Sequence, residues 1–174
     1  MQNQLSNQTT PLSRRAVSML LWLALGAGLA VSIFTVVEEM CLATACRDTA
    51  SFTFFGVGMG RFGIAYFIII LILLRMRSRN NLLEWALTAM VFAGVGSEFR
   101  LLWIQKFIIG GWCPLCVSIC CALFIAGGML LIEKMLATGS LPEERKKLAG
   151  WAAFAVAMAA AGLAIALVGV QALT

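Results

Sequence analysis

Five stretches of mostly apolar residues, each about long enough to cross a lipid bilayer, dominate this chain of 174 residues. A spanning helix needs about 20 such residues, and lipid forces its backbone to satisfy its own hydrogen bonds. The chain is 61% hydrophobic and only 12% charged, whereas about a quarter of the residues in a soluble domain are charged. We therefore predict an all-α integral membrane protein with a four-helix transmembrane bundle plus a fifth transmembrane helix.

The expected spans are separated by short polar connections. The first runs from Ala16 to Val37, after an N-terminal tail over residues 1–15. A signal peptide is the alternative for this segment, but the apolar run is longer than the roughly 7–15 residues usual in one. The predicted bundle covers residues 16–135 with an outer loop at 38–58, followed by a connector at 136–148 and the fifth helix at 149–174.

Basic residues are unevenly shared between the two sides of the predicted bundle. With the N-terminus inside, nine of them fall on the cytoplasmic side and four on the outer side, as the positive-inside rule expects. The cytoplasmic set is Arg14, Arg15, Arg75, Arg77, Arg79, Lys134, Arg145, Lys146 and Lys147, and the outer set is Arg47, Arg61, Arg100 and Lys106. This orientation places the C-terminus outside, and it accounts for the net charge of +5 without a nucleic-acid partner.

The chain contains no histidine but six cysteines. Without imidazole there is no histidine base, no histidine-ligated haem and no histidine-containing zinc site. Thiol chemistry is therefore the first candidate for any activity of this protein.

A Cys-Pro-Leu-Cys sequence, Cys113 to Cys116, opens the fourth apolar segment. Proline is well tolerated at the first position of a helix, which would make Cys113 the N-cap. The helix dipole and the unsatisfied N–H groups there favour a thiolate, the species that attacks disulfides. A structural disulfide or half of a metal site is the alternative for this pair.

A second pair, Cys41 and Cys46, lies in the polar break after the first span, on the same predicted side. These cysteines could bridge each other, or Cys46 could reach the fourth span through a mixed disulfide. A zinc site formed by all four cysteines is the competing interpretation. Cys120 and Cys121 lie deeper in the fourth span, and packing is the preferred explanation for both, because cysteine is often buried as a small apolar residue.

Three stretches of the chain resemble the vitamin K epoxide reductase family, particularly its bacterial homologues. They are the loop pair Cys41 and Cys46, the glycine-rich and aromatic segment 55–67, and the segment 97–105 running on to Cys113 and Cys116. In this order they cover roughly residues 16–135. The sequence departs from the family where Gly58 replaces a frequent proline and Gly60 replaces a frequent hydroxyl residue.

The resemblance implies an enzyme of the bacterial inner membrane, a thiol:quinone oxidoreductase. Electrons would enter at Cys41 and Cys46, pass from Cys46 to Cys113, and reach a quinone, ubiquinone or menaquinone, that faces Cys116. Because many bacterial members carry a thioredoxin-like domain after the fifth span, the end of this chain at Thr174 implies a separate extracytoplasmic thioredoxin-like partner. We expect the quinone at the outer end of the bundle, and the predicted lining residues are Phe62, Tyr66, Phe99 and Trp112.

Two charged residues within the third span need an explanation of their own. Ionisable residues inside spans are usually buried against partners or are functional. Glu98 and Arg100 could reach the membrane surface or pair with Arg61, and the alternative is proton delivery by Glu98, because quinone reduction consumes protons. The glycines between Gly56 and Gly63 would allow close helix contact or a bent start to the second span.

Other classes of protein fit the pattern less well. The disulfide bond formation protein B family shares the chemistry, but its Cys-x-x-Cys pair comes in the first outer loop, the reverse of the order here. A non-catalytic membrane protein with structural disulfides or a cysteine metal site is the main alternative. A transporter has little support, since the spans lack a visible repeat or a midplane charge pair.

Overall fold

In the computed structural model, residues 11–41, 52–137 and 142–172 are described, and most of them are helical. Within these ranges, five helices are long and apolar enough to cross a membrane. The chain is thus predominantly helical and has the helices of a multi-pass membrane protein, as its hydropathy predicts. The helices are α1 (Pro11–Cys41), α3 (Met59–Met76), α4 (Asn81–Ile104), α5 (Pro114–Ala137) and α6 (Pro142–Gly169).

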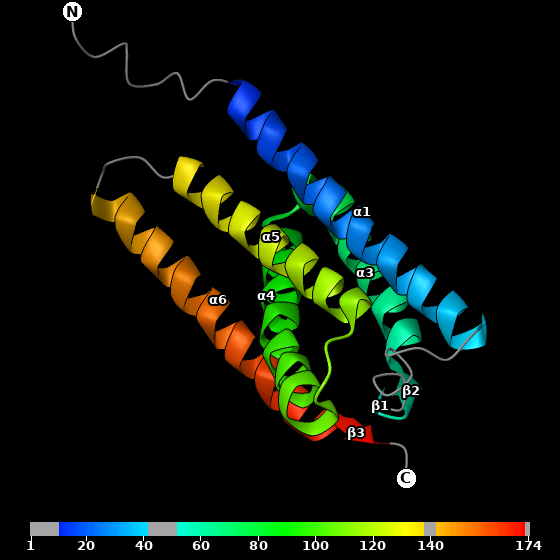
Figure 1. Ribbon diagram of the computed structural model, residues 1–174. Coiled ribbons are helices and arrows are strands. Elements are labelled where there is room, and N and C mark those ends of the chain that lie inside the picture. The colour runs from blue at the N-terminus through cyan, green and yellow to red at the C-terminus, as the bar shows by residue number, and fades with distance from the viewer. Residues whose placement is uncertain (1–10, 42–51, 138–141, 173–174) are drawn as a thin grey trace, which may run out of the picture.

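Four of the helices contact one another in a closed ring (Figure 1). Helix α1 packs against α3 and α5, and α4 packs against the same two helices from the other side. Helix α6 packs chiefly along α4, outside this ring. Two short connections complete the helical part: the 3-10 turn η1 (Arg77–Arg79) leads into α4, and the π-helical segment η2 (Gln105–Ile109) extends α4 toward α5.

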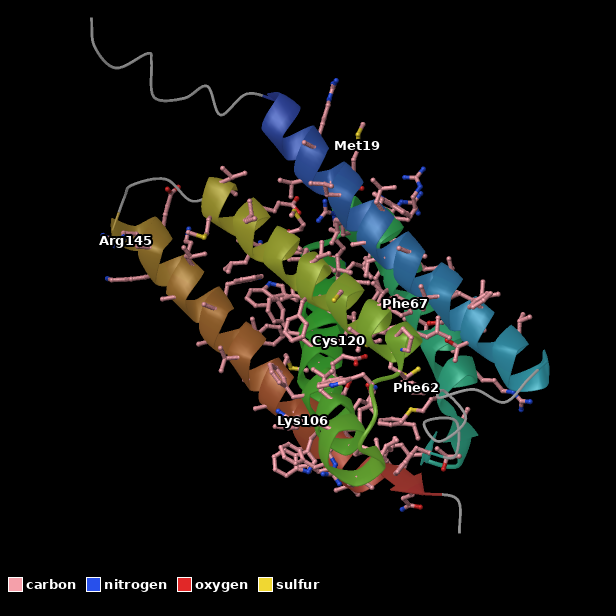
Figure 2. The ribbon with its side chains drawn as sticks, viewed as in Figure 1. Met19, Phe62, Phe67, Lys106, Cys120 and Arg145 are labelled. Carbon is pink, nitrogen blue, oxygen red and sulfur yellow. The ribbon has the colours of Figure 1, made fainter. Side chains whose placement is uncertain are left out.

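A core of apolar side chains fills the ring and continues under α6. Phe67 of α3 is a fully buried member of this core, and Trp151 of α6 belongs to the same cluster. Figure 2 shows Phe67 deep among the helices. The core also contains Leu21, Leu25, Ile70, Leu74, Leu87, Val91, Leu123, Ala126, Leu130 and Ala155.

Glycines bring pairs of helices into very close contact. A Cβ atom on Gly96 of α4 would meet the backbone of Ala159, and one on Gly162 of α6 would meet the backbone of Ala93. Small residues let helix backbones approach in this way, and close packing is a main source of helix association in lipid. At these two glycines the backbones of α4 and α6 touch directly, and the aromatic pairs Trp85–Phe154 and Phe92–Trp151 complete the contact.

Several element ends differ from those expected from hydropathy. Helix α1 begins at Pro11, inside the predicted tail, and continues to Cys41, inside the predicted outer loop. Helix α6 begins at Pro142, inside the predicted connector. Hydropathy marks where a chain leaves the hydrocarbon, whereas a helix continues for as long as its backbone hydrogen bonds do, so charged turns extend these helices beyond the apolar run.

A small antiparallel sheet was not expected in a chain predicted to be all-α. Strand β1 (Phe52–Phe54) lies between β2 (Val57–Gly58) and β3 (Val170–Ala172), with Thr53 opposite both Gly58 and Gln171. The predicted fifth helix therefore ends at Gly169, and residues 170–172 turn into a strand.

The turn between β1 and β2 explains part of the glycine-rich segment. Phe55 and Gly56 both have positive φ angles, 49° and 80°, as the two-residue turns of tight hairpins require. The N–H of Phe55 donates a hydrogen bond of 2.9 Å to the carbonyl oxygen of Gly169. The hairpin that precedes α3 is thereby joined to the end of α6.

The two ends of the molecule differ in chemistry. At the end away from the sheet, Arg77 forms an ion pair of 2.7 Å with Glu133, and Lys134 pairs with Glu84. At the other end, the sheet packs on a second apolar cluster around Ile104. Figure 1 shows the start of α5 at the sheet end, so the Cys-Pro-Leu-Cys sequence lies far from these ion pairs.

Candidate functional site

The Cys-Pro-Leu-Cys sequence forms the N-terminus of α5. The helix begins at Pro114, and the carbonyl oxygen of Cys113 accepts a hydrogen bond of 3.0 Å from the N–H of Val117. Cys113 therefore occupies the N-cap position that the sequence predicts for it. Its side chain is 2% exposed, and Cys116 is half-buried.

Gln105 supports this helix start from the π-helical segment. Its side-chain carbonyl oxygen accepts a hydrogen bond of 3.3 Å from the N–H of Cys113, and its backbone carbonyl oxygen accepts one of 3.2 Å from Gly111. Gly110 makes the reversal possible with a φ angle of 72°. The side chain of Gln105 is buried, so it holds the connection between α4 and α5 in one conformation.

Sequence reasoning included Gln105 in the motif but gave it no role. The sequence does contain a feature that indicates a structural role for Gln105: it is a lone amide, eight residues before Cys113, in an otherwise largely apolar stretch. A buried amide needs hydrogen-bond partners, which suggests a structural task at such a position.

The other predicted redox pair is only partly described. Cys41 is the last residue of α1, rather than a loop residue, and Cys46 lies outside the described residues. The end of α1 and the start of α5 lie at the same end of the molecule (Figure 1), since the two helices pack side by side in opposite directions. Exchange between the two pairs stays a prediction.

The two remaining cysteines have opposite surroundings. Cys120 is buried, one turn after Cys116 on α5, and Figure 2 shows it inside the helical assembly. Cys121 is exposed, so packing accounts for Cys120 better than for Cys121.

A polar group lies in the interior beside Cys120. Glu98 of α4 is 6% exposed, and its carboxyl acts electrostatically on both the Tyr66 hydroxyl and the Cys120 thiol. The Tyr66 hydroxyl donates a hydrogen bond of 2.7 Å to the carbonyl oxygen of Met90. It fits against α4 because the residue there is Gly94, where a Cβ atom would collide with the hydroxyl.

This burial excludes the first explanation offered for Glu98. The side chain does not extend to the surface, and within the described residues it has no ion pair. Arg61 is exposed at the start of α3. The sequence could not distinguish these outcomes, because the direction in which Glu98 points depends on how α4 is rotated against its neighbours.

The four predicted quinone-lining residues fall into separate places. Phe62 and Tyr66 are neighbours on α3, with stacked rings 6.2 Å apart. The ring of Phe99 packs edge-on against that of Phe124 of α5, with the ring centroids 5.6 Å apart. Trp112, the residue directly before Cys113, is exposed. Only Tyr66 lies mostly inside the helical assembly; a quinone contact for any of the four stays a prediction.

The described residues contain no group of three or more cysteine, aspartate or glutamate side chains that could hold a metal ion. Cys46, one of the four cysteines of the predicted zinc site, lies outside the described residues. No protein-family model matches the chain, and no curated protein matches it either.

Proposed function

We propose that this protein is a quinone-dependent thiol oxidoreductase of a bacterial inner membrane, which reoxidises a separate thioredoxin-like protein outside the cytoplasm. The observation that carries the proposal is the placement of Cys113 and Cys116 at the start of α5, at the end of the molecule where α1 ends with Cys41. A dithiol at a helix start has its thiolate form stabilised, which exchange requires.

In the proposed reaction, the partner's dithiol reduces the disulfide of Cys41 and Cys46. That pair then reduces a disulfide between Cys113 and Cys116 through a mixed disulfide of Cys46 and Cys113. The thiols of Cys113 and Cys116 finally pass two electrons and two protons to ubiquinone or menaquinone, which leaves as the quinol. Each step exchanges one disulfide or one quinone for its reduced form, so the electrons balance.

The distribution of charge supports the proposed orientation. Arg75 lies in the last turn of α3, and Arg77 and Arg79 lie in the turn η1 that follows it. Arg145 at the start of α6 lies at the same end of the molecule, away from the sheet (Figure 2). The positive-inside rule places this end in the cytoplasm and the cysteines on the outer face, where disulfides persist.

The test combines purified protein, a quinone and a reduced thioredoxin-like protein, and follows quinone absorbance. We expect dithiol oxidation that depends on the quinone, and its loss in Cys116→Ala. Cys121→Ala is the matched control, since Cys121 is on the same helix but exposed, and it should retain wild-type turnover. Wild-type turnover in Cys116→Ala would contradict the proposal, and cysteines that resist alkylation whatever the state of the quinone pool would favour a non-catalytic membrane protein.

A further inference from the structure

Glu98 is a carboxyl group buried among the helices without a compensating partner. It is 6% exposed, and the described residues offer it neither a hydrogen bond nor an ion pair. Burying an unpaired, ionised carboxylate in apolar surroundings costs much free energy, and burying the protonated, neutral carboxyl group costs far less. Ionisable residues in such places within a span commonly serve proton transfer.

Two groups that interact electrostatically with Glu98 can also hold or pass a proton. Tyr66 contributes a phenol from α3, and Cys120 contributes a thiol from α5. The phenol is held in place by its hydrogen bond to Met90. The carboxyl, the phenol and the thiol thus come from three different helices of the ring, and only their packing brings them together.

Of the three side chains Glu98, Tyr66 and Cys120, the last lies close to the proposed redox pair. Cys120 follows Cys116 by four residues, which places the two thiols on one face of α5, about 6 Å apart along its axis. A quinone ring reached by Cys116 from the start of α5 would therefore be near the carboxyl of Glu98. Phe62, stacked on Tyr66, extends the same region toward the sheet end (Figure 2).

We infer that Glu98 is the group that delivers a proton to the quinone during its reduction by Cys113 and Cys116. This inference depends on the proposed function. Oxidation of the two thiols to a disulfide releases two electrons and two protons, and reduction of a quinone to a quinol takes up both. Glu98 gives its proton to one quinone oxygen and regains one released by the thiols; the second thiol proton supplies the other quinol hydroxyl. No further oxidant or reductant is needed.

The first test compares two substitutions on the same helix. Glu98→Gln keeps the shape of the side chain but replaces the acidic carboxyl group with an amide that cannot donate a proton to a quinone. Glu84→Gln makes the same chemical change at the far end of α4, where Glu84 pairs with Lys134. We expect quinol formation to fall about 100-fold or more in Glu98→Gln, with little change in Glu84→Gln. Disulfide exchange with the partner in the absence of quinone should be unchanged in both variants, and Glu98→Asp should restore part of the rate.

A second readout does not depend on turnover. The infrared difference spectrum between oxidised and reduced wild-type protein should contain a carbonyl band of a protonated carboxyl group, shifted by ¹³C-labelled glutamate and absent in Glu98→Gln. If Glu98→Gln does not fold, the labelled wild-type protein and Glu98→Asp decide the question.

The failure of this inference can be distinguished from the failure of the proposed function. If the wild-type protein showed no quinone-dependent oxidation of the dithiol, both the proposed function and the role of Glu98 would be wrong. Active wild-type protein combined with full quinol formation in Glu98→Gln, or with no glutamate band in the spectrum, would overturn the role of Glu98 and leave the thiol chemistry intact.

Discussion

The side-chain carbonyl of Gln105 accepts a hydrogen bond from the backbone N–H of Cys113, which connects the π-helical end of α4 to the first turn of α5. An N–H at the start of a helix has no partner within that helix, and here a buried side chain from the preceding element supplies one. The position of the first cysteine of the pair therefore depends on a residue eight positions earlier.

Replacing this acceptor should loosen the helix start. In Gln105→Leu the N–H of Cys113 loses its buried partner, at a cost of about 1–3 kcal/mol in the free energy of unfolding. We expect a lower melting temperature in detergent and faster alkylation of Cys113. Lys106→Gln is the control, because Lys106 is the exposed neighbour, and it should change neither quantity. Equal alkylation rates in Gln105→Leu and wild type would show that the hydrogen bond does not restrain Cys113.

The contact between α4 and α6 should be sensitive to the size of one residue. In Gly162→Leu the new side chain would collide with the backbone of Ala93, which cannot move without shifting α4. We expect separation of α6 from α4 and a loss of about 1–3 kcal/mol or more in stability, measured by thermal unfolding. Gly150→Leu makes the same change on the same helix where a Cβ atom meets nothing within 4 Å, and it should be tolerated. Similar melting temperatures for the two variants would argue against this helix contact.

The fit of Tyr66 against Gly94 can be measured as a coupling energy. Gly94→Ala should destabilise the protein, because the added methyl group would overlap the Tyr66 hydroxyl. Tyr66→Phe alone should cost about 0.5–1.5 kcal/mol through the lost hydrogen bond to Met90. The double variant should be more stable than the sum of the two losses predicts, since removing the hydroxyl relieves part of the overlap. Strict additivity in unfolding measurements would contradict this contact.

The ion pair between Arg77 and Glu133 should contribute little to stability. The two side chains are 19% and 32% exposed, and pairs of this kind contribute about 0–1 kcal/mol. Arg77→Ala should therefore lower the melting temperature only slightly, and added salt should reduce the difference from wild type. A loss well above 1 kcal/mol would mean that Arg77 has a further structural role.

The predictions that succeeded from sequence depend on local chemistry. Apolar length alone located the five helices, because each one must satisfy its own backbone in lipid. The N-cap position of Cys113 followed from the proline after it, whose fixed φ angle and missing N–H suit the first helical position. In both cases the controlling residues are close together in the chain.

The predictions that failed depend on partners far away in the chain. Strand β3 exists because residues 170–172 meet β1, more than a hundred positions earlier, and nothing in their own sequence marks them as a strand. The burial of Glu98 beside Tyr66 depends on the rotation of α4 relative to α3 and α5.

The sequence by itself thus determined the number of spans, their approximate limits and the helix start that carries a cysteine pair, since these follow from hydropathy and backbone geometry over a few turns. Only the tertiary structure decided that α6 lies along α4, that Gln105 supports Cys113, and that Glu98 is buried where its carboxyl acts electrostatically on Tyr66 and Cys120. Those relationships arise from helix rotation and close backbone contact, which an individual segment cannot specify.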